Sequence, residues 1–386
     1  MSTSLAHINP EMLKWARNAL KLSIPLAAKK ICVSSEKLES WENGDDLPTI
    51  NQLYTICKVY KRPFALFYFS EPPEQFRPLK DFRRFPAPFK LSENDEYILQ
   101  KELLLFHRKR EMALDLHEQL ETPTNSFELR GSITDTTTSL ANKIIEYFKV
   151  DHNKIRQLVP GYEALNYWKR LLENNGFLIF QTSGVSLPIM RGACISSDIL
   201  PVIIINSNDT ENGRIFSLFH ELVHIIINEE GISNFRYHNQ ELFDPIEVFC
   251  NQVSAEVLVP SKLLSSHPIV SYHNQKDYSW TNNELTKLSQ LFCVSQEVIL
   301  RRLLSLGRTN NSFYQEFRDS QVLPVRKKQT GGNYYRNIIA KNGGLFLNLA
   351  LEGYYQNKIS ASSLSDYIQM KVSNLSKLEH LLYAKI

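Results

Sequence analysis

The sequence predicts an α+β protein that is mainly helical and divided into more than one domain. Its 386 residues exceed the roughly 250–300 at which a single hydrophobic core stops growing. Apolar residues recur at helical spacing over most of the chain, whereas runs typical of strands are found at 176–180 and 200–206. These observations predict an N-terminal helical bundle, a second domain with a small sheet, and a helical C-terminal region.

Prolines and changes in composition mark the predicted boundaries. The first unit spans 8–70 and ends at Glu71-Pro72-Pro73-Glu74, where proline stops a helix. A linker is expected over 71–94, and a long helix at 95–120 opens a domain over 95–310. The remainder, 311–386, is expected to be basic and helical. The helices predicted within the second domain span 135–148, 161–175, 211–228 and 245–259.

Overall charge and cysteine usage exclude several classes of protein. The chain has 44 Lys+Arg against 41 Asp+Glu, so nucleic-acid binding would need a local basic patch. Its five cysteines are widely spaced without a Cys-x-x-Cys pair, which indicates reduced thiols rather than a disulfide framework. No signal peptide and no apolar run of roughly 20 residues is evident. We therefore expect a cytoplasmic protein without a membrane partner.

The segment 214–227 contains the pattern His-Glu-x-x-His, formed by His220, Glu221 and His224. On a helix, two histidines four residues apart project from one face and can hold a single Zn²⁺. Glu221 then sits beside the metal, where its carboxylate can take a proton from the attacking water and pass it to the departing amine. The pattern therefore predicts a catalytic zinc site.

A catalytic zinc has three protein ligands, so one more must come from elsewhere in the chain. Glu247 is a candidate, but it also fits a helix-capping box that starts at Asp244 and Pro245. Spacing alone does not separate these two interpretations. Other potential ligands are His238, Glu241 and Glu256. Potential donors to a transition-state oxyanion are Tyr237, His238, Tyr272 and His273, and the sequence does not choose among them.

Three successive motifs resemble the ImmA/IrrE family of zinc metallopeptidases. They are the segment 214–227, then Glu247-x-x-Cys250-Asn251, and then 255–260, which ends in proline. That family typically has His-Glu-x-x-His followed by a helix that reads Glu-x-x-Ala-Asn and ends in a Leu-Met-Pro-like stop. The resemblance implies a zincin-like fold, with His220, His224 and Glu247 as zinc ligands and Glu221 as catalytic base. Cys250 replaces the usual alanine and Val259 the usual methionine, both in apolar positions.

Residues 24–44 predict two short helices that cross closely. Ser34 is suited to cap the start of the second helix, and Gly44 follows its end. The ending Trp41-Glu42-x-Gly44 resembles the XRE (Cro/C1-type) helix-turn-helix family, which implies a lambda-repressor-like bundle. In that family the second helix enters the major groove of DNA. The candidate DNA-contacting residues are Ser35, Lys37 and Ser40.

The charge of this second helix argues against DNA binding. It is expected to expose Glu36, Glu39 and Glu42 against Lys37, and carboxylates that face phosphates lose the main source of DNA affinity. Cys32 also occupies the turn position where the family usually has glycine. A protein-docking module therefore stays as an alternative to sequence-specific DNA binding. Dimerisation through this module would set two half-sites in register.

Basic residues gather in the segment 301–341, where nine Lys/Arg against two Asp/Glu give a charge of +7. Such a segment could bind DNA or an acidic partner protein, although most charge runs are solvated faces. The run Gly331-Gly332-Asn333-Tyr334-Tyr335-Arg336 and the helical ending at 359–382 resemble the tail of longer ImmA/IrrE chains. The basic residues are Arg301, Arg302, Arg308, Arg318, Arg326, Lys327, Lys328, Arg336 and Lys341.

Two functional hypotheses follow from these patterns. The first is a zinc-dependent endopeptidase fused to a helix-turn-helix, which cleaves a transcriptional repressor or another regulatory protein. The second is a DNA-binding regulator or antitoxin whose peptidase-like domain binds a partner toxin or senses a signal with little turnover. Both hypotheses allow a homodimer.

Overall fold

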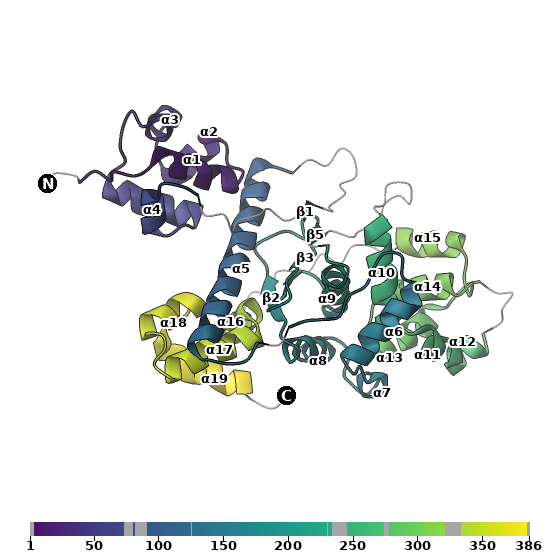
Figure 1. Cartoon of the computed structure of the whole chain (residues 1–386). Coiled ribbons are helices and arrows are strands. Elements are labelled where there is room, and N and C mark those ends of the chain that lie inside the picture. Colours follow the sequence, from purple (N-terminus) through teal and green to yellow (C-terminus); the bar gives the residue numbers. More distant parts are fainter. Residues whose placement is uncertain are drawn as a thin grey trace. The chain divides into compact units, whose positions relative to one another are not determined.

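The computed structural model describes residues 4–72, 80–81, 91–124, 126–229, 231–233, 245–273, 278–320 and 333–383 (Figure 1). The chain forms two compact units. Unit 1 comprises Met1–Leu79 and Phe85–Lys109, and unit 2 comprises Lys80–Arg84 and Arg110–Ile386. The predicted α+β, mainly helical fold is confirmed. None of the described helices combines the length and apolar composition needed to cross a bilayer.

Unit 1 is a bundle of short helices around one apolar core, in which Trp41 and Phe67 are fully buried. The predicted caps of its third helix are confirmed: the Ser34 side chain accepts a hydrogen bond from the Lys37 N–H, and Gly44 is left-handed with φ 81°. The elements are α1 (Pro10–Ala19), α2 (Ile24–Ile31), α3 (Ser35–Asn43), α4 (Ile50–Tyr60), η1 (Phe64–Tyr68) and the first part of α5 (Glu93–Gln119).

The long helix predicted at 95–120 is α5, and the two units share it. Tyr97 and Leu104 on its first part pack into the core of unit 1, whereas the helix belongs to unit 2 from Arg110 onward. In unit 2, the Arg110 guanidinium donates to the Leu200 carbonyl at 3.1 Å.

The turn between α2 and α3 contains Cys32 at the position where the helix-turn-helix family usually has glycine. Cys32 adopts a left-handed conformation with φ 64°, although it lacks the conformational freedom of glycine.

The prediction that α3 exposes Glu42 is wrong. Glu42 is buried, and both of its carboxylate oxygens accept hydrogen bonds from the Arg17 guanidinium, at 2.8 and 2.9 Å. Arg17 also donates to the Leu22 carbonyl at 2.7 Å. Glu42 lies four residues after the buried Leu38, on the helix face that packs into the bundle. Its charge is therefore neutralised inside the unit, and the exposed carboxylates of α3 are those of Glu36 and Glu39.

Replacing Glu42 by alanine should unfold unit 1 more readily, because it leaves the Arg17 guanidinium buried without its carboxylate partner. Losing one member of a buried ion pair costs about 3–5 kcal/mol. Hydrogen–deuterium exchange of the full chain should show faster exchange in α1–α4. As a control, the double variant Arg17→Met/Glu42→Leu removes both charges and should recover most of the protection. Equal exchange in the wild type and Glu42→Ala would show that the pair contributes little to stability.

Unit 2 is built on a five-stranded mixed sheet with strand order β1-β5-β3-β4-β2. The predicted strands at 176–180 and 200–206 correspond to β2 and β4, which pair in parallel. The sequence did not indicate β3, because its Gly-Ala-Cys-Ile run lacks strong strand formers. The strands are β1 (Lys80–Asp81), β2 (Leu178–Thr182), β3 (Gly192–Ile195), β4 (Val202–Asn206) and β5 (Gly231–Ser233).

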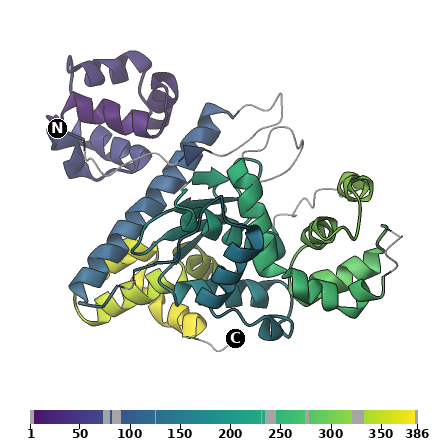
Figure 2. The same cartoon turned by 45° about the vertical axis from the view of Figure 1, so that its right-hand side comes forward.

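Helices cover both faces of this sheet (Figure 2). One face packs on α8 (Tyr162–Glu173) and α9 (Glu211–Ile226), whose Trp168 and Phe219 rings meet edge to face at 4.7 Å. The other face carries Phe180, which contacts Phe346 of the C-terminal region. The helices on that side are α16 (Tyr334–Asn342) and α17 (Gly344–Tyr355). The C-terminal region therefore completes the core of unit 2.

The remaining helices of unit 2 lie beside α10 or beside the C-terminal helices α16 and α17. Those that precede the strand β2 in the chain are α6 (Thr137–Tyr147), which packs on α10, and α7 (His152–Ile155). Those that follow α9 in the chain are α10 (Pro245–Leu258), α11 (Ser261–Ser266), α12 (Pro268–Ser271), α13 (Asn282–Phe292), α14 (Gln296–Ser305) and α15 (Asn311–Ser320). The C-terminal ones are α18 (Ala361–Ile368), η3 (Val372–Asn374) and α19 (Leu375–Tyr383).

The basic residues of 301–341 do not form one surface patch in the described part of that segment. Arg302 is buried, where it pairs with Glu256 and donates to the Val259 carbonyl at 3.1 Å. Arg301 donates to the Tyr314 hydroxyl at 3.0 Å. Some of the predicted charge thus stabilises the packing of α14. Arg326, Lys327 and Lys328 lie outside the described residues.

Candidate metal centre

The His-Glu-x-x-His pattern lies on α9, a helix surrounded by other elements. The Thr210 hydroxyl caps its start by accepting from the Gly213 N–H at 3.1 Å. Every residue from 214 to 226 is buried, because α9 packs on β3, β4, α8 and α10. A helix that is apolar on nearly every side is stable only inside a core. The side chains at 220, 221 and 224 are therefore held in fixed positions.

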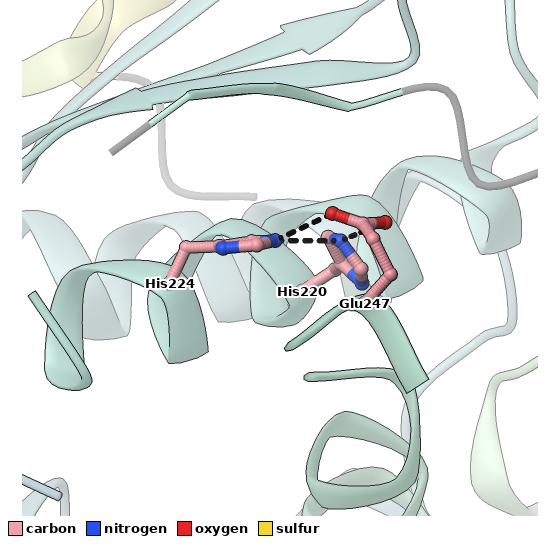
Figure 3. Close-up of side chains that lie close together, drawn as sticks. All are labelled: His220, His224 and Glu247. Atoms are coloured by element: carbon pink, nitrogen blue, oxygen red, sulfur yellow. Dashed lines mark hydrogen bonds and ion pairs between the residues drawn. The ribbon is translucent and has the colours of Figure 1, made fainter. Parts of the chain in front are cut away.

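The side chain of Glu247 on α10 reaches both histidines of α9 (Figure 3). Its Oε1 lies 3.0 Å from His224 Nε2, and its Oε2 lies 3.3 Å from His220 Nε2. The two Nε2 atoms are themselves 3.1 Å apart. Ligand atoms around a tetrahedral ion with bonds of roughly 2.0–2.1 Å are about 3.3 Å apart. The three side chains therefore have the spacing of a group that could hold a metal ion.

The pKa shifts of His220 and Glu247 also suit metal binding. Burial lowers the pKa of His220 below its ordinary value, which favours the neutral imidazole. Burial opposes ionisation of Glu247, but the charges and hydrogen bonds of His220 and His224 outweigh it and hold the pKa of the carboxyl well below its usual range. A metal ion binds the neutral imidazole and the carboxylate. The shifts of His220 and Glu247 therefore both favour the forms that bind a metal ion.

Asn251, one turn after Glu247 on α10, contacts the ring of His220 from the other side. Its Oδ1 lies 3.1 Å from His220 Nδ1 and accepts a hydrogen bond from that nitrogen. The tautomer with hydrogen on Nδ1 leaves the lone pair of Nε2 directed at the other two ligand atoms. The sequence motif contained Asn251 but did not indicate this role. Only the packing of α10 on α9 brings it to the ring.

Replacing Asn251 by alanine should weaken metal binding about 10–100-fold, the usual effect of losing a hydrogen-bond partner of a ligand. The loss follows because His220 no longer has a fixed tautomer. Competition with a chromogenic chelator measures the affinity. The neighbouring exposed Gln252 provides the control, since Gln252→Ala should leave the affinity unchanged. Equal affinities of Asn251→Ala and wild type would contradict the assigned role.

Glu221 is fully buried and lies against the backbone of β3. A Cβ atom added to Gly192 would come within 2.4 Å of Glu221 Oε1 and 2.8 Å of its Cγ. Only glycine leaves room for the glutamate side chain at this place. Gly192 is therefore part of the site, although nothing in its local sequence pointed to it. A glycine in a buried strand is the kind of signal that marks a close approach of another group.

The other candidate ligands are placed differently or fall outside the described residues. Glu256 is paired with Arg302 and accepts hydrogen bonds from Ser261, so its carboxylate stabilises the turn after α10. His273 stacks on Trp280 at 3.9 Å, and Tyr272 is 87% exposed. Those outside the described residues are Tyr237, His238, Glu241 and the expected cap Asp244. Among the described residues, His220, His224 and Glu247 form the one group with metal-ligand spacing.

The candidate DNA-contacting residues lie on α3 of unit 1. The Lys37 side chain is exposed and forms an ion pair with Asp46. The Ser40 hydroxyl donates to the Lys37 carbonyl at 2.9 Å, and Ser35 is half-buried in the first turn. Contact with phosphates through Lys37 would therefore have to compete with Asp46.

Two parts of the chain match known protein families. Residues 184–304 match a peptidase family described as IrrE N-terminal-like domain, and residues 13–67 match the helix-turn-helix family. The first match contains α9, α10 and the His/His/Glu group, so this part of the chain is metallopeptidase-like. Neither the curated proteins nor the solved structures gave a match. Together, the two family matches correspond to those of an ImmA/IrrE protein with an N-terminal XRE-type helix-turn-helix.

Proposed function

We propose that this protein is a zinc-dependent endopeptidase that cleaves a transcriptional repressor or another regulatory protein. The observation that carries the proposal is the convergence of two imidazole nitrogens and a carboxylate within 4.8 Å of one another, with Glu221 next to His220. Two histidines and one carboxylate are a common ligand set of catalytic zinc, which keeps a further position open. The family match of residues 184–304 supports the same chemistry.

His220, His224 and Glu247 would hold the zinc, and Glu221 would move the proton. When bound, zinc acts as a Lewis acid toward the scissile carbonyl and makes water more acidic. Glu221 accepts a proton from the attacking water on its carboxylate and delivers it to the nitrogen of the leaving amine. Since α9 and β3 enclose the Glu221 side chain, the carboxylate has little freedom to leave this position. Asn251 keeps the His220 ring oriented throughout.

The helix-turn-helix would bring the peptidase to its place of action. A helix-turn-helix domain suggests DNA binding, and Ser35, Lys37 and Ser40 are the side chains we propose to contact DNA. The exposed Glu36 and Glu39 on the same helix weaken the attraction to phosphates. We therefore propose that this unit recognises a specific site or a protein bound there, rather than DNA in general. A repressor bound to DNA could be located by the helix-turn-helix and cleaved by the peptidase part of the chain.

Removing the metal should abolish cleavage, and adding zinc should restore it. We expect the purified chain to contain zinc in a one-to-one ratio, measured by plasma mass spectrometry. Cleavage of candidate repressors is followed by mass spectrometry of the fragments, after dialysis against a chelator and after addition of Zn²⁺ or Mg²⁺. Mg²⁺ should not restore activity, because it prefers octahedral oxygen ligands. Native protein without metal, or cleavage that persists after chelation, would overturn the proposal.

A further inference from the structure

The backbone of β3 runs directly beside the carboxylate that we propose as catalytic base. The position of a Cβ on Gly192 would overlap Glu221 Oε1 at 2.4 Å, so Glu221 lies on the face of the sheet at this residue. A carboxylate reaches a scissile bond through one water, which spans about two hydrogen bonds of 2.6–3.2 Å. The peptide to be cleaved must therefore pass about 5–6 Å from Glu221.

A strand paired with β3 lies at this distance. Residues directly opposite each other in an antiparallel pair have Cα atoms about 4.5–5.5 Å apart. A peptide that adds to β3 opposite Gly192 would thus place its backbone within reach of water held by Glu221. Addition of an extended segment to a sheet edge also supplies affinity through main-chain hydrogen bonds, independent of most side chains. The edge of β3 that faces away from β4 meets both requirements.

In this structure the strand β5 of the same chain is paired with that edge of β3. β5 pairs antiparallel with β3, and Ser233, Ile232 and Gly231 lie opposite Gly192, Ala193 and Cys194. The other side of β5 pairs in parallel with β1, where Lys80 lies opposite Gly231 and Asp81 opposite Ile232. β1 belongs to unit 2, yet the chain on both sides of residues 80–84 belongs to unit 1.

We propose that the edge of β3 beside Gly192 is the docking edge for an extended substrate segment, and that β5 is its internal occupant, held in place by β1. This inference rests on the proposed peptidase function, because it assumes that the bound peptide is a substrate. Binding of a peptide to this edge can nevertheless be measured without cleavage. β5 is three residues long, so few backbone hydrogen bonds hold it. A longer substrate strand can displace it by forming more of them.

The test weakens the pairing of β5 with β3 by a substitution and adds a free peptide that has the sequence of β5. Ile232→Pro removes the N–H of a strand that is paired on both sides, where proline is not tolerated. Ile232→Val keeps the N–H and the strand preference and is the matched control. All variants carry Glu221→Gln, so that binding is measured without cleavage. The probe is a fluorescein-labelled peptide with the sequence of residues 228–236, and its binding to the zinc-loaded protein is followed by fluorescence anisotropy.

We expect the peptide to bind at least about tenfold more tightly to Ile232→Pro than to Ile232→Val, since the internal strand no longer competes; tenfold corresponds to about 1.4 kcal/mol. Hydrogen–deuterium exchange must show that the amides of Gly231 and Ser233 have opened while α9 stays protected. Opened amides without tighter binding would overturn the inference. If Ile232→Pro does not fold, Asp81→Pro serves instead, because it disturbs β1, the outermost described strand of the sheet, where a proline costs less than inside the sheet. Asp81→Pro should raise the affinity by a smaller factor, and unchanged binding despite opened amides would again overturn it.

Activity separates this inference from the proposed function. With Glu221 restored, the Ile232→Pro protein should cleave the repressor substrate faster than Ile232→Val. Tighter peptide binding without any cleavage, in zinc-loaded protein, would refute the peptidase but retain the docking edge. Cleavage by the wild type together with unchanged peptide binding in the opened variants would retain the peptidase and refute the docking edge.

Discussion

Replacement of Glu221 by glutamine should lower the rate of repressor cleavage by about 10²–10⁴-fold, the usual contribution of a general base, while zinc stays bound. Glutamine has the same size and fills the space beside Gly192, where Glu221 now lies. Its amide cannot accept a proton from water at neutral pH. The loss should therefore appear in kcat rather than in zinc content, measured on the same preparation.

Glu118→Gln provides a matched control for this experiment. Glu118 is an exposed residue of α5, and its change to glutamine should leave both zinc content and kcat at wild-type values. Equal cleavage by Glu221→Gln and wild type would refute the role of Glu221 as base. Loss of zinc from Glu221→Gln would show instead that Glu221 stabilises the metal group.

Replacement of Glu247 by alanine should reduce zinc affinity by more than the 10–100-fold expected for an outer partner such as Asn251. Glu247 supplies the sole negative charge among the three converging side chains. The two histidines that remain lie on one helix, and the described residues offer no other third ligand beside them. A chelator competition measures the affinity. In addition, zinc should raise the Tm of the wild type but not of Glu247→Ala, since a ligand stabilises the native state only where it binds.

Glu256 on the same helix provides the control, because it is also buried and was also a candidate ligand. Glu256→Gln breaks the ion pair with Arg302 and should lower the Tm of the protein without zinc. Its zinc affinity should stay at the wild-type value. If Glu256→Gln lost zinc and Glu247→Ala kept it, the assignment of the third ligand would be wrong.

Much of the fold was predictable where local rules decide the structure. The helices at 211–228 and 245–259 were placed within a few residues of α9 and α10, because helical periodicity and a terminal proline are local signals. Ser34 and Gly44 were recognised as the caps of α3 for the same reason. In contrast, Glu42 was placed on the wrong face, since its partner Arg17 lies 25 residues away on another helix.

The sequence by itself determined that His220 and His224 share one side of a helix, because four residues make about one turn. It left open whether Glu247 caps its own helix or joins the histidines. The packing of α10 on α9 puts the Glu247 side chain beside the two histidines. The positions of Asn251, Gly192 and β5 were likewise decided by contacts between segments far apart in the sequence, such as the pairing of Gly192 with Ser233. Periodicity within one element carries no information on which other element will lie against it.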